Sequence, residues 1–164
     1  MTFEDYQREA VKFRTATANN EEYLTLGLIE EVGEAAGKLA KRTRDGVWDE
    51  KAFIKELGDI LWFVANLADY YDREHDTNFS AELKESFKMD THNGATAEYT
   101  IIRVACYALD TINDCGGYFN DLIAELGDLA CRFDYTLEQV AEINLAKLRD
   151  RQARGVINGN GDER

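Results

Sequence analysis

Apolar residues recur every three or four positions through most of this chain, which is the spacing of one face of an α-helix. The pattern is clearest over residues 21–44, where it stops at Asp45-Gly46, and over residues 49–71, where Asp49 can cap the helix. Proline is absent, and β-branched residues form no long alternating run. A length of 164 residues suits a single core. We therefore expect one all-α domain over residues 1–164.

Shorter helical patterns occur on both sides of these two segments. They cover residues 3–17, 79–87, 97–112 and 118–133, and a last helix follows Thr136. The helices over 97–112 and 118–133 are separated only by Gly116-Gly117, so we expect them to form a hairpin. Thr136 with Gln139 three residues later predicts a capping box. The Gly- and Asn-rich tail from Gly155 is expected to be irregular.

The chain is strongly acidic, with 32 Asp and Glu against 19 Lys and Arg and a formal charge of -13. Because binding to DNA or RNA depends on basic residues that meet phosphates, this charge argues against a nucleic-acid polymer as partner. A small triphosphate remains compatible, since a divalent cation can bridge carboxylates and phosphate oxygens. The N-terminal residues lack the pattern of a signal peptide, and the longest apolar run, Ile60–Ala65, is too short to span a bilayer. We expect a cytoplasmic protein without a membrane partner.

Two acidic motifs stand out, Glu30-Glu31-x-x-Glu34 in the first long helix and Glu56-x-x-Asp59 in the second. Carboxylates three or four residues apart lie on one side of a helix, and two such helices can gather oxygen ligands around Mg²⁺. On a helical wheel Glu56 falls inside the apolar sector and Asp59 just beyond its edge. Glu31 lies at the apolar margin of its helix. Glu30 and Glu34 fall on the polar side, where an ordinary solvated surface is an equally good interpretation.

The two motifs in their sequence context resemble those of MazG-like nucleoside triphosphate pyrophosphatases. The matching strings are GLIEEVGE at 27–34 and ELGDILWF at 56–63, and residues 136–151 are similar to the closing helix of the family with its Asn, Lys and Arg. The resemblance covers residues 3–70 and 134–164. It implies a MazG-like helical bundle in which an inserted helical segment, approximately residues 72–133, separates the third core helix from the C-terminal helix.

The resemblance also implies a metal site. Residue by residue, it assigns Glu31, Glu34, Glu56 and Asp59 as ligands of Mg²⁺, with Mn²⁺ as a possible substitute. It leaves Glu30 as an additional ligand or as a base that orients the attacking water.

For the substrate, the resemblance implies that Asn66 faces the nucleotide and that Lys147 and Arg151 contact the phosphates. Plain surface charge is an equally good interpretation of these two basic residues. Asn20, in the loop before the first long helix, is a candidate to contact the base or sugar. Because relatives share sites between subunits, a homo-oligomer, either dimer or tetramer, is expected.

The expected insertion contains a second Glu-Leu-Gly-Asp string, from Glu125 to Asp128. No Glu-Glu-x-x-Glu partner lies at a similar distance from it. Leu122, Leu126 and Leu129 form a packing stripe, which predicts that Glu125 and Asp128 lie on the outer side of their helix. A metal role is therefore not expected here.

The expected activity is Mg²⁺-dependent hydrolysis of an NTP or dNTP to the monophosphate and pyrophosphate, for control or house-cleaning of the nucleotide pool. One alternative is a non-catalytic acidic helical adaptor that binds a basic protein partner. Another is a di-metal bundle, but such sites use Glu-x-x-His motifs, and neither His75 nor His92 stands in one.

Overall fold

The computed structural model describes residues 1–88 and 94–156 of the chain. Within these ranges it contains helices and turns but no strand, which confirms the all-α prediction. The α-helices are α1 (Phe3–Ala10), α2 (Glu21–Asp45), α3 (Glu50–His75), α4 (Phe79–Ser86), α5 (Ala97–Asn113), α6 (Phe119–Cys131) and α7 (Leu137–Ala153). His92 and the tail beyond residue 156 lie outside the described residues.

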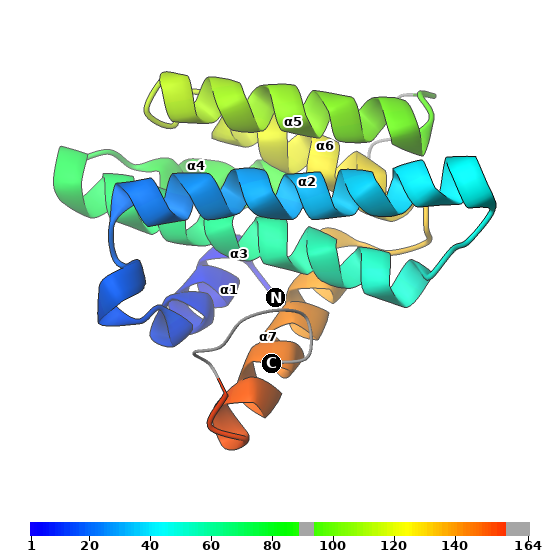
Figure 1. Cartoon of the computed structure of the whole chain (residues 1–164). Coiled ribbons are helices and arrows are strands. Elements are labelled where there is room, and N and C mark those ends of the chain that lie inside the picture. The colour runs from blue at the N-terminus through cyan, green and yellow to red at the C-terminus, as the bar shows by residue number, and fades with distance from the viewer. Residues whose placement is uncertain (89–93, 157–164) are drawn as a thin grey trace.

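The two long helices α2 and α3 form an antiparallel hairpin at the centre of the molecule (Figure 1). A second hairpin, α5–α6, packs on one side of it through α2 and α5, as the break at Gly116-Gly117 predicted. On the other side α7 packs against α3, beside α1. Helix α3 therefore has neighbours on several sides, which explains why it carries more buried residues than any other described helix.

Local capping groups set the ends of the two long helices. The Asn20 side chain accepts a hydrogen bond from the backbone N–H of Tyr23 at 2.8 Å, and that of Asp49 accepts one from Ala52 at 3.0 Å. Gly46 ends α2 in the left-handed region, with φ of 68°. Caps therefore fix the start of both helices and the end of α2.

The first helix is shorter than its apolar spacing predicts. It ends at Ala10 and is followed by two 3₁₀ turns, Val11–Phe13 and Ala16–Ala18. The Thr15 hydroxyl accepts a hydrogen bond from the backbone N–H of Ala18 at 3.3 Å, an alternative to helical pairing that Thr side chains favour. The prediction of a helix to residue 17 was wrong, because the backbone is extended at Arg14, with φ of -73° and ψ of 119°. Among the described helices, none is long and apolar enough to cross a membrane.

Candidate functional site

Three carboxylates meet between α2 and α3. Glu31, Glu56 and Asp59 each place one oxygen so that all three oxygens lie within 4.8 Å of one another. Glu56 is buried, with 4% of its surface exposed, and the other two are half-buried. The helical wheel predicted the buried position of Glu56 and the marginal positions of Glu31 and Asp59. Clustered carboxylate oxygens are the ligands that hard divalent cations such as Mg²⁺ take from proteins.

The electrostatics of this cluster favour a cation. Burial, followed by the charges of Asp59, Glu56 and Glu34, raises the pKa of Glu31 to about 8. Burial also raises the pKa of Glu56, although its ion pair with Lys38 opposes the rise. Like charges that are crowded and poorly solvated disfavour ionisation, and a bound cation removes this penalty. The donor set and its excess negative charge therefore fit a divalent metal ion.

Two lysines hold the carboxylates that come from α3. Lys38 of α2 places Nζ 2.9 Å from Glu56 Oε1, and Lys147 of α7 forms an ion pair with Asp59. Lys147 was a predicted phosphate contact, whereas nothing in the sequence singled out Lys38. A lysine one turn after an acidic motif on a charged helix resembles any other surface lysine.

A buried hydrogen-bond chain fixes the orientation of Asp59. Asn144 Nδ2 donates to Asp59 Oδ1 at 3.0 Å, and the Tyr6 hydroxyl donates to Asn144 Oδ1 at 2.9 Å. Burial, with the nearby charge of Asp59, raises the pKa of Tyr6, so its hydroxyl keeps its proton. Sequence reasoning assigned no role to Tyr6 or Asn144. The available signal was the spacing of Asn144, Lys147 and Arg151 along α7.

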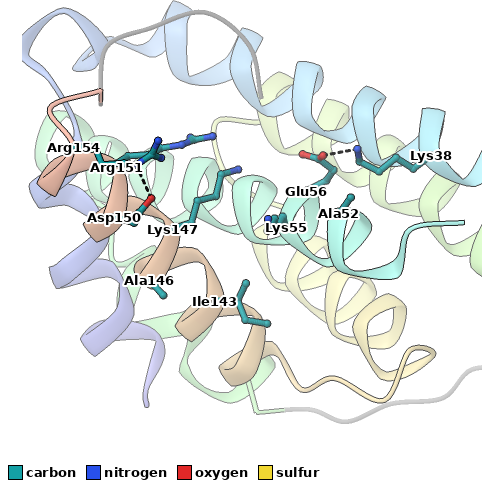
Figure 2. A pocket seen from close by; sticks show the side chains of 10 residues that line it. All are labelled: Lys38, Ala52, Lys55, Glu56, Ile143, Ala146, Lys147, Asp150, Arg151 and Arg154. Carbon is teal, nitrogen blue, oxygen red and sulfur yellow. Dashed lines mark hydrogen bonds and ion pairs between the residues drawn. The ribbon is translucent and has the colours of Figure 1, made fainter. Parts of the chain in front are cut away.

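A pocket of about 540 Å³ opens beside the carboxylates, between α2, α3 and α7 (Figure 2). Glu56 lies on its wall, while Glu31 and Asp59 do not line it. Basic side chains dominate the lining and are Lys38, Lys55, Lys147, Arg151 and Arg154. A chain with only 19 basic residues thus gathers five of them next to its acidic cluster. Such a pocket suits a polyanion such as a polyphosphate.

The structure does not bring every predicted metal residue into the cluster. Glu30 and Glu34 are exposed on α2, as the helical wheel predicted. Glu34 is still near enough for its charge to raise the pKa of Glu31. The ligand role of Glu34 and the role of Glu30 as ligand or base stay predictions.

The two predicted asparagine contacts lie away from the pocket. Asn66 is fully buried; its Nδ2 donates to the Trp62 carbonyl oxygen at 2.8 Å, while its Oδ1 has no hydrogen-bond partner among the described residues. Asn20 caps α2, and its Nδ2 donates to the Thr17 carbonyl oxygen at 2.7 Å. Both side chains therefore have structural partners, and their substrate roles stay predictions.

The second Glu-Leu-Gly-Asp string is not on an outer surface, so that prediction was wrong. Glu125 is 7% exposed and Asp128 is 1% exposed. Arg103 of α5 forms an ion pair with Glu125, and Arg132 Nη2 lies 2.7 Å from Asp128 Oδ2. Helix α5 covers this side of α6, and the leucine stripe could not reveal a second packing partner.

Residues 19–89 match the family model of the MazG nucleotide pyrophosphohydrolase domain. The matched segment is less than half of the chain. It contains α2, α3 and α4, and thus extends past residue 72, where the sequence predicted the insertion to begin.

A protein of Mycobacterium phage L5, "Gene 37 protein", is 44% identical over 55 residues, which make up 30% of this chain and 48% of that protein. The chain thus spans about half the length of this curated relative. No solved structure matches the chain. Over residues 19–89, which hold the hairpin with the three clustered carboxylates, this chain is MazG-like.

Proposed function

We propose that this protein is a Mg²⁺-dependent nucleoside triphosphate pyrophosphohydrolase, which converts an NTP or dNTP to the monophosphate and pyrophosphate. The observation that carries the proposal is the position of the acidic cluster directly beside a basic pocket, with Glu56 belonging to both. A metal–triphosphate complex is complementary to both, because its cation would pair with the carboxylates and its phosphates with the basic side chains. The MazG match over residues 19–89 supports the same class of reaction.

Glu31, Glu56 and Asp59 would hold the metal ion, with Glu34 as a further ligand and Mn²⁺ as a substitute. A bound divalent ion would supply Lewis acidity and positive charge at the phosphates. In the overall reaction a water oxygen bonds to the α-phosphorus, the bond to the α–β bridging oxygen breaks, and pyrophosphate leaves. Asn144 and Tyr6 keep Asp59 in position through their hydrogen bonds.

The basic wall of the pocket would receive the phosphates. Lys147 and Arg151 lie on one face of α7, and Lys55 faces the same pocket from α3. Arginine presents paired donors to phosphate oxygens, and lysine offers a compact charge. These groups stabilise the charge that develops on the departing pyrophosphate.

The experiment is a panel of the eight common NTPs and dNTPs with Mg²⁺, in which monophosphate and pyrophosphate are separated by chromatography. We expect cleavage that Glu56→Gln abolishes. Glu142→Gln, at an exposed position of α7, is the matched control and should retain activity. Inactivity across the panel, without stabilisation by Mg²⁺, would instead favour the acidic adaptor that binds a basic protein.

The wider role belongs to the same proposal. A pyrophosphohydrolase of this type would act on the cytoplasmic nucleotide pool, and we propose a homo-oligomer of single-domain subunits. The panel also ranks the bases and separates ribose from deoxyribose substrates.

A further inference from the structure

The α5–α6 hairpin repeats the α2–α3 hairpin at a constant offset of 69 residues. Glu125 follows Glu56, and Asp128 follows Asp59, by this number. The first helix of each hairpin ends near a residue with positive φ, Gly46 at 68° and Cys115 at 44°, which are again 69 positions apart. Two independent landmarks, the Glu-x-x-Asp string and the positive-φ residue before it, thus share one offset.

The burial pattern repeats with the same offset. The buried residues of α2 at 32, 35 and 39 correspond to buried residues of α5 at 101, 104 and 108. In α3 and α6 the agreement covers the buried apolar positions 53, 54, 57, 60 and 61, which correspond to 122, 123, 126, 129 and 130. Two hairpins with the same buried faces therefore pack against each other within one chain.

The offset also identifies what replaces the acidic motif of α2. Thr100 takes the position of Glu31, and Arg103 takes that of Glu34. The Thr100 hydroxyl donates to Asp128 Oδ2 at 3.2 Å, and Arg103 forms its ion pair with Glu125. The second hairpin thus has a partner motif at the expected distance, although it is no longer acidic.

The charges of the two clusters differ by one unit. In the first, the three clustered carboxylates (Glu31, Glu56, Asp59) face two ammonium groups (Lys38, Lys147), which leaves a formal charge of one negative unit. In the second, two carboxylates (Glu125, Asp128) face two guanidinium groups (Arg103, Arg132), which leaves none. The first cluster therefore keeps an excess of negative charge that suits a cation, whereas the second is already neutral.

We propose that α5–α6 is a second copy of the metal-binding hairpin in which the Arg103 guanidinium occupies the cation position, so that the chain binds divalent metal at one hairpin only. One carboxylate oxygen of the copied site still lacks a partner in the part of the chain that the structure describes. Glu125 Oε2 is buried and has no hydrogen-bond partner among the described residues. The inference rests on the proposed metal role of the first hairpin only for the identity of the cation.

The test is to count bound Mn²⁺ per chain by titration calorimetry on the full-length protein. Wild type should bind at one class of site, which Glu56→Gln removes. The double variant Thr100→Glu/Arg103→Glu restores both acidic positions and should gain a second class of site, which a further Glu125→Gln change removes. Lys51→Glu makes the Arg103→Glu charge change at an exposed position and should gain none.

A wild-type protein with two classes of site, one of which Glu125→Gln abolishes, would overturn the proposal. A folded double variant that gains no site would do the same. If wild type binds no Mn²⁺ at all, the metal role in the proposed function and the claim of one metal-binding hairpin both fail, while the double variant still decides whether Arg103 occupies a cation position.

A second variant keeps the test decisive should the double variant fail to fold. Arg103→Ser removes the guanidinium and leaves Glu125 and Asp128 beside two hydroxyl groups. Its Tm should rise with Mn²⁺ by more than that of wild type, because a cation can then fill the place of Arg103. An equal rise in both proteins would contradict the proposal.

Discussion

Glu31 shows how a single residue can serve a site at the expense of stability. Its carboxylate is half-buried among like charges, which holds its pKa at about 8, far above the ordinary 4.5. Between these two values the folded protein binds protons that the unfolded chain does not. Stability in the absence of divalent cations should therefore fall as pH rises from about 4.5 to about 8.

Glu31→Gln should remove this pH dependence. In EDTA at pH 8 we expect the variant to be more stable than wild type by roughly 1–2 kcal/mol, a value reduced for the partial exposure of the side chain. At pH 5 the two proteins should differ little. Thermal unfolding at both pH values measures this. An identical loss of stability between pH 5 and 8 in both proteins would contradict the role given to Glu31.

The basic wall of the pocket should act on substrate affinity. Lys147→Met and Arg151→Met should each raise KM for the preferred triphosphate about ten-fold, since a charged hydrogen bond to phosphate contributes on the order of 1.5 kcal/mol. Arg149→Met is the control, because Arg149 lies on α7 outside the pocket lining. An equal effect at all three positions would point to a general charge effect.

At the scale of single residues, the sequence predicted a functional role where the type of a residue conflicts with its position on the helix. Glu56 could be found because a carboxylate inside an apolar sector needs a partner. Lys38 and Lys55 could not, since exposed lysines on an acidic helical protein are common and only the fold places them beside α7. Tyr6 resembled an ordinary core residue, because its place in the apolar spacing reflects the packing of its ring. That spacing gives no sign of the hydrogen bond that its hydroxyl donates.

The α2–α3 hairpin depends on close contact between its helices. A Cβ at Gly27 would lie 2.2 Å from the ring of Phe63, which is itself buried, whereas one at Gly37 would meet nothing within 4 Å. Both glycines are in α2, so a comparison of their alanine variants separates the effect of packing on stability from that of helix propensity.

Gly27→Ala should destabilise the protein by about 1–3 kcal/mol, because the Phe63 ring must move within a packed site. Gly37→Ala should be neutral or stabilise by up to about 1 kcal/mol through better helix propensity. Urea unfolding of both variants provides the measurement. Equal stability changes would show that the helices do not approach as closely as described.

Helix ends could be predicted where a cap was visible, as at Asp49 and Thr136. The end of α1 could not, because the apolar spacing continues through residue 13 although the backbone is extended at Arg14. Glu125 and Asp128 were misplaced for another reason. A leucine stripe shows that one side of a helix packs against a neighbour. It does not show that a second helix, here α5, covers another side.

At the scale of the whole molecule, the outer side of α5 carries exposed apolar side chains. Tyr99, Ile102 and Leu109 of α5 are each more than half exposed and are spaced along one side of that helix. Exposed apolar groups that gather on one surface are typical of protein–protein contacts. The proposed homo-oligomer would use this surface, since the hairpins already cover each other inside the chain.

The variant Ile102→Glu/Leu109→Glu should therefore lower the oligomeric state while leaving the helix content unchanged. Light scattering coupled to size-exclusion chromatography, with circular dichroism as the check on folding, measures both properties. Lys51→Glu, on the exposed side of α3, should have no effect. A wild-type monomer, or an oligomer that this double variant does not weaken, would contradict the proposed interface.

The central claim is that the acidic cluster beside the basic pocket cleaves the α–β bond of a triphosphate. The most direct measurement is turnover of the preferred substrate with Mg²⁺ in ¹⁸O-labelled water, with wild type and Glu56→Gln side by side. We predict that the label appears in the monophosphate, with one unlabelled pyrophosphate per turnover, and that the variant shows no turnover. Nucleoside diphosphate and orthophosphate as products, label in the pyrophosphate, or undiminished turnover by Glu56→Gln would contradict the account.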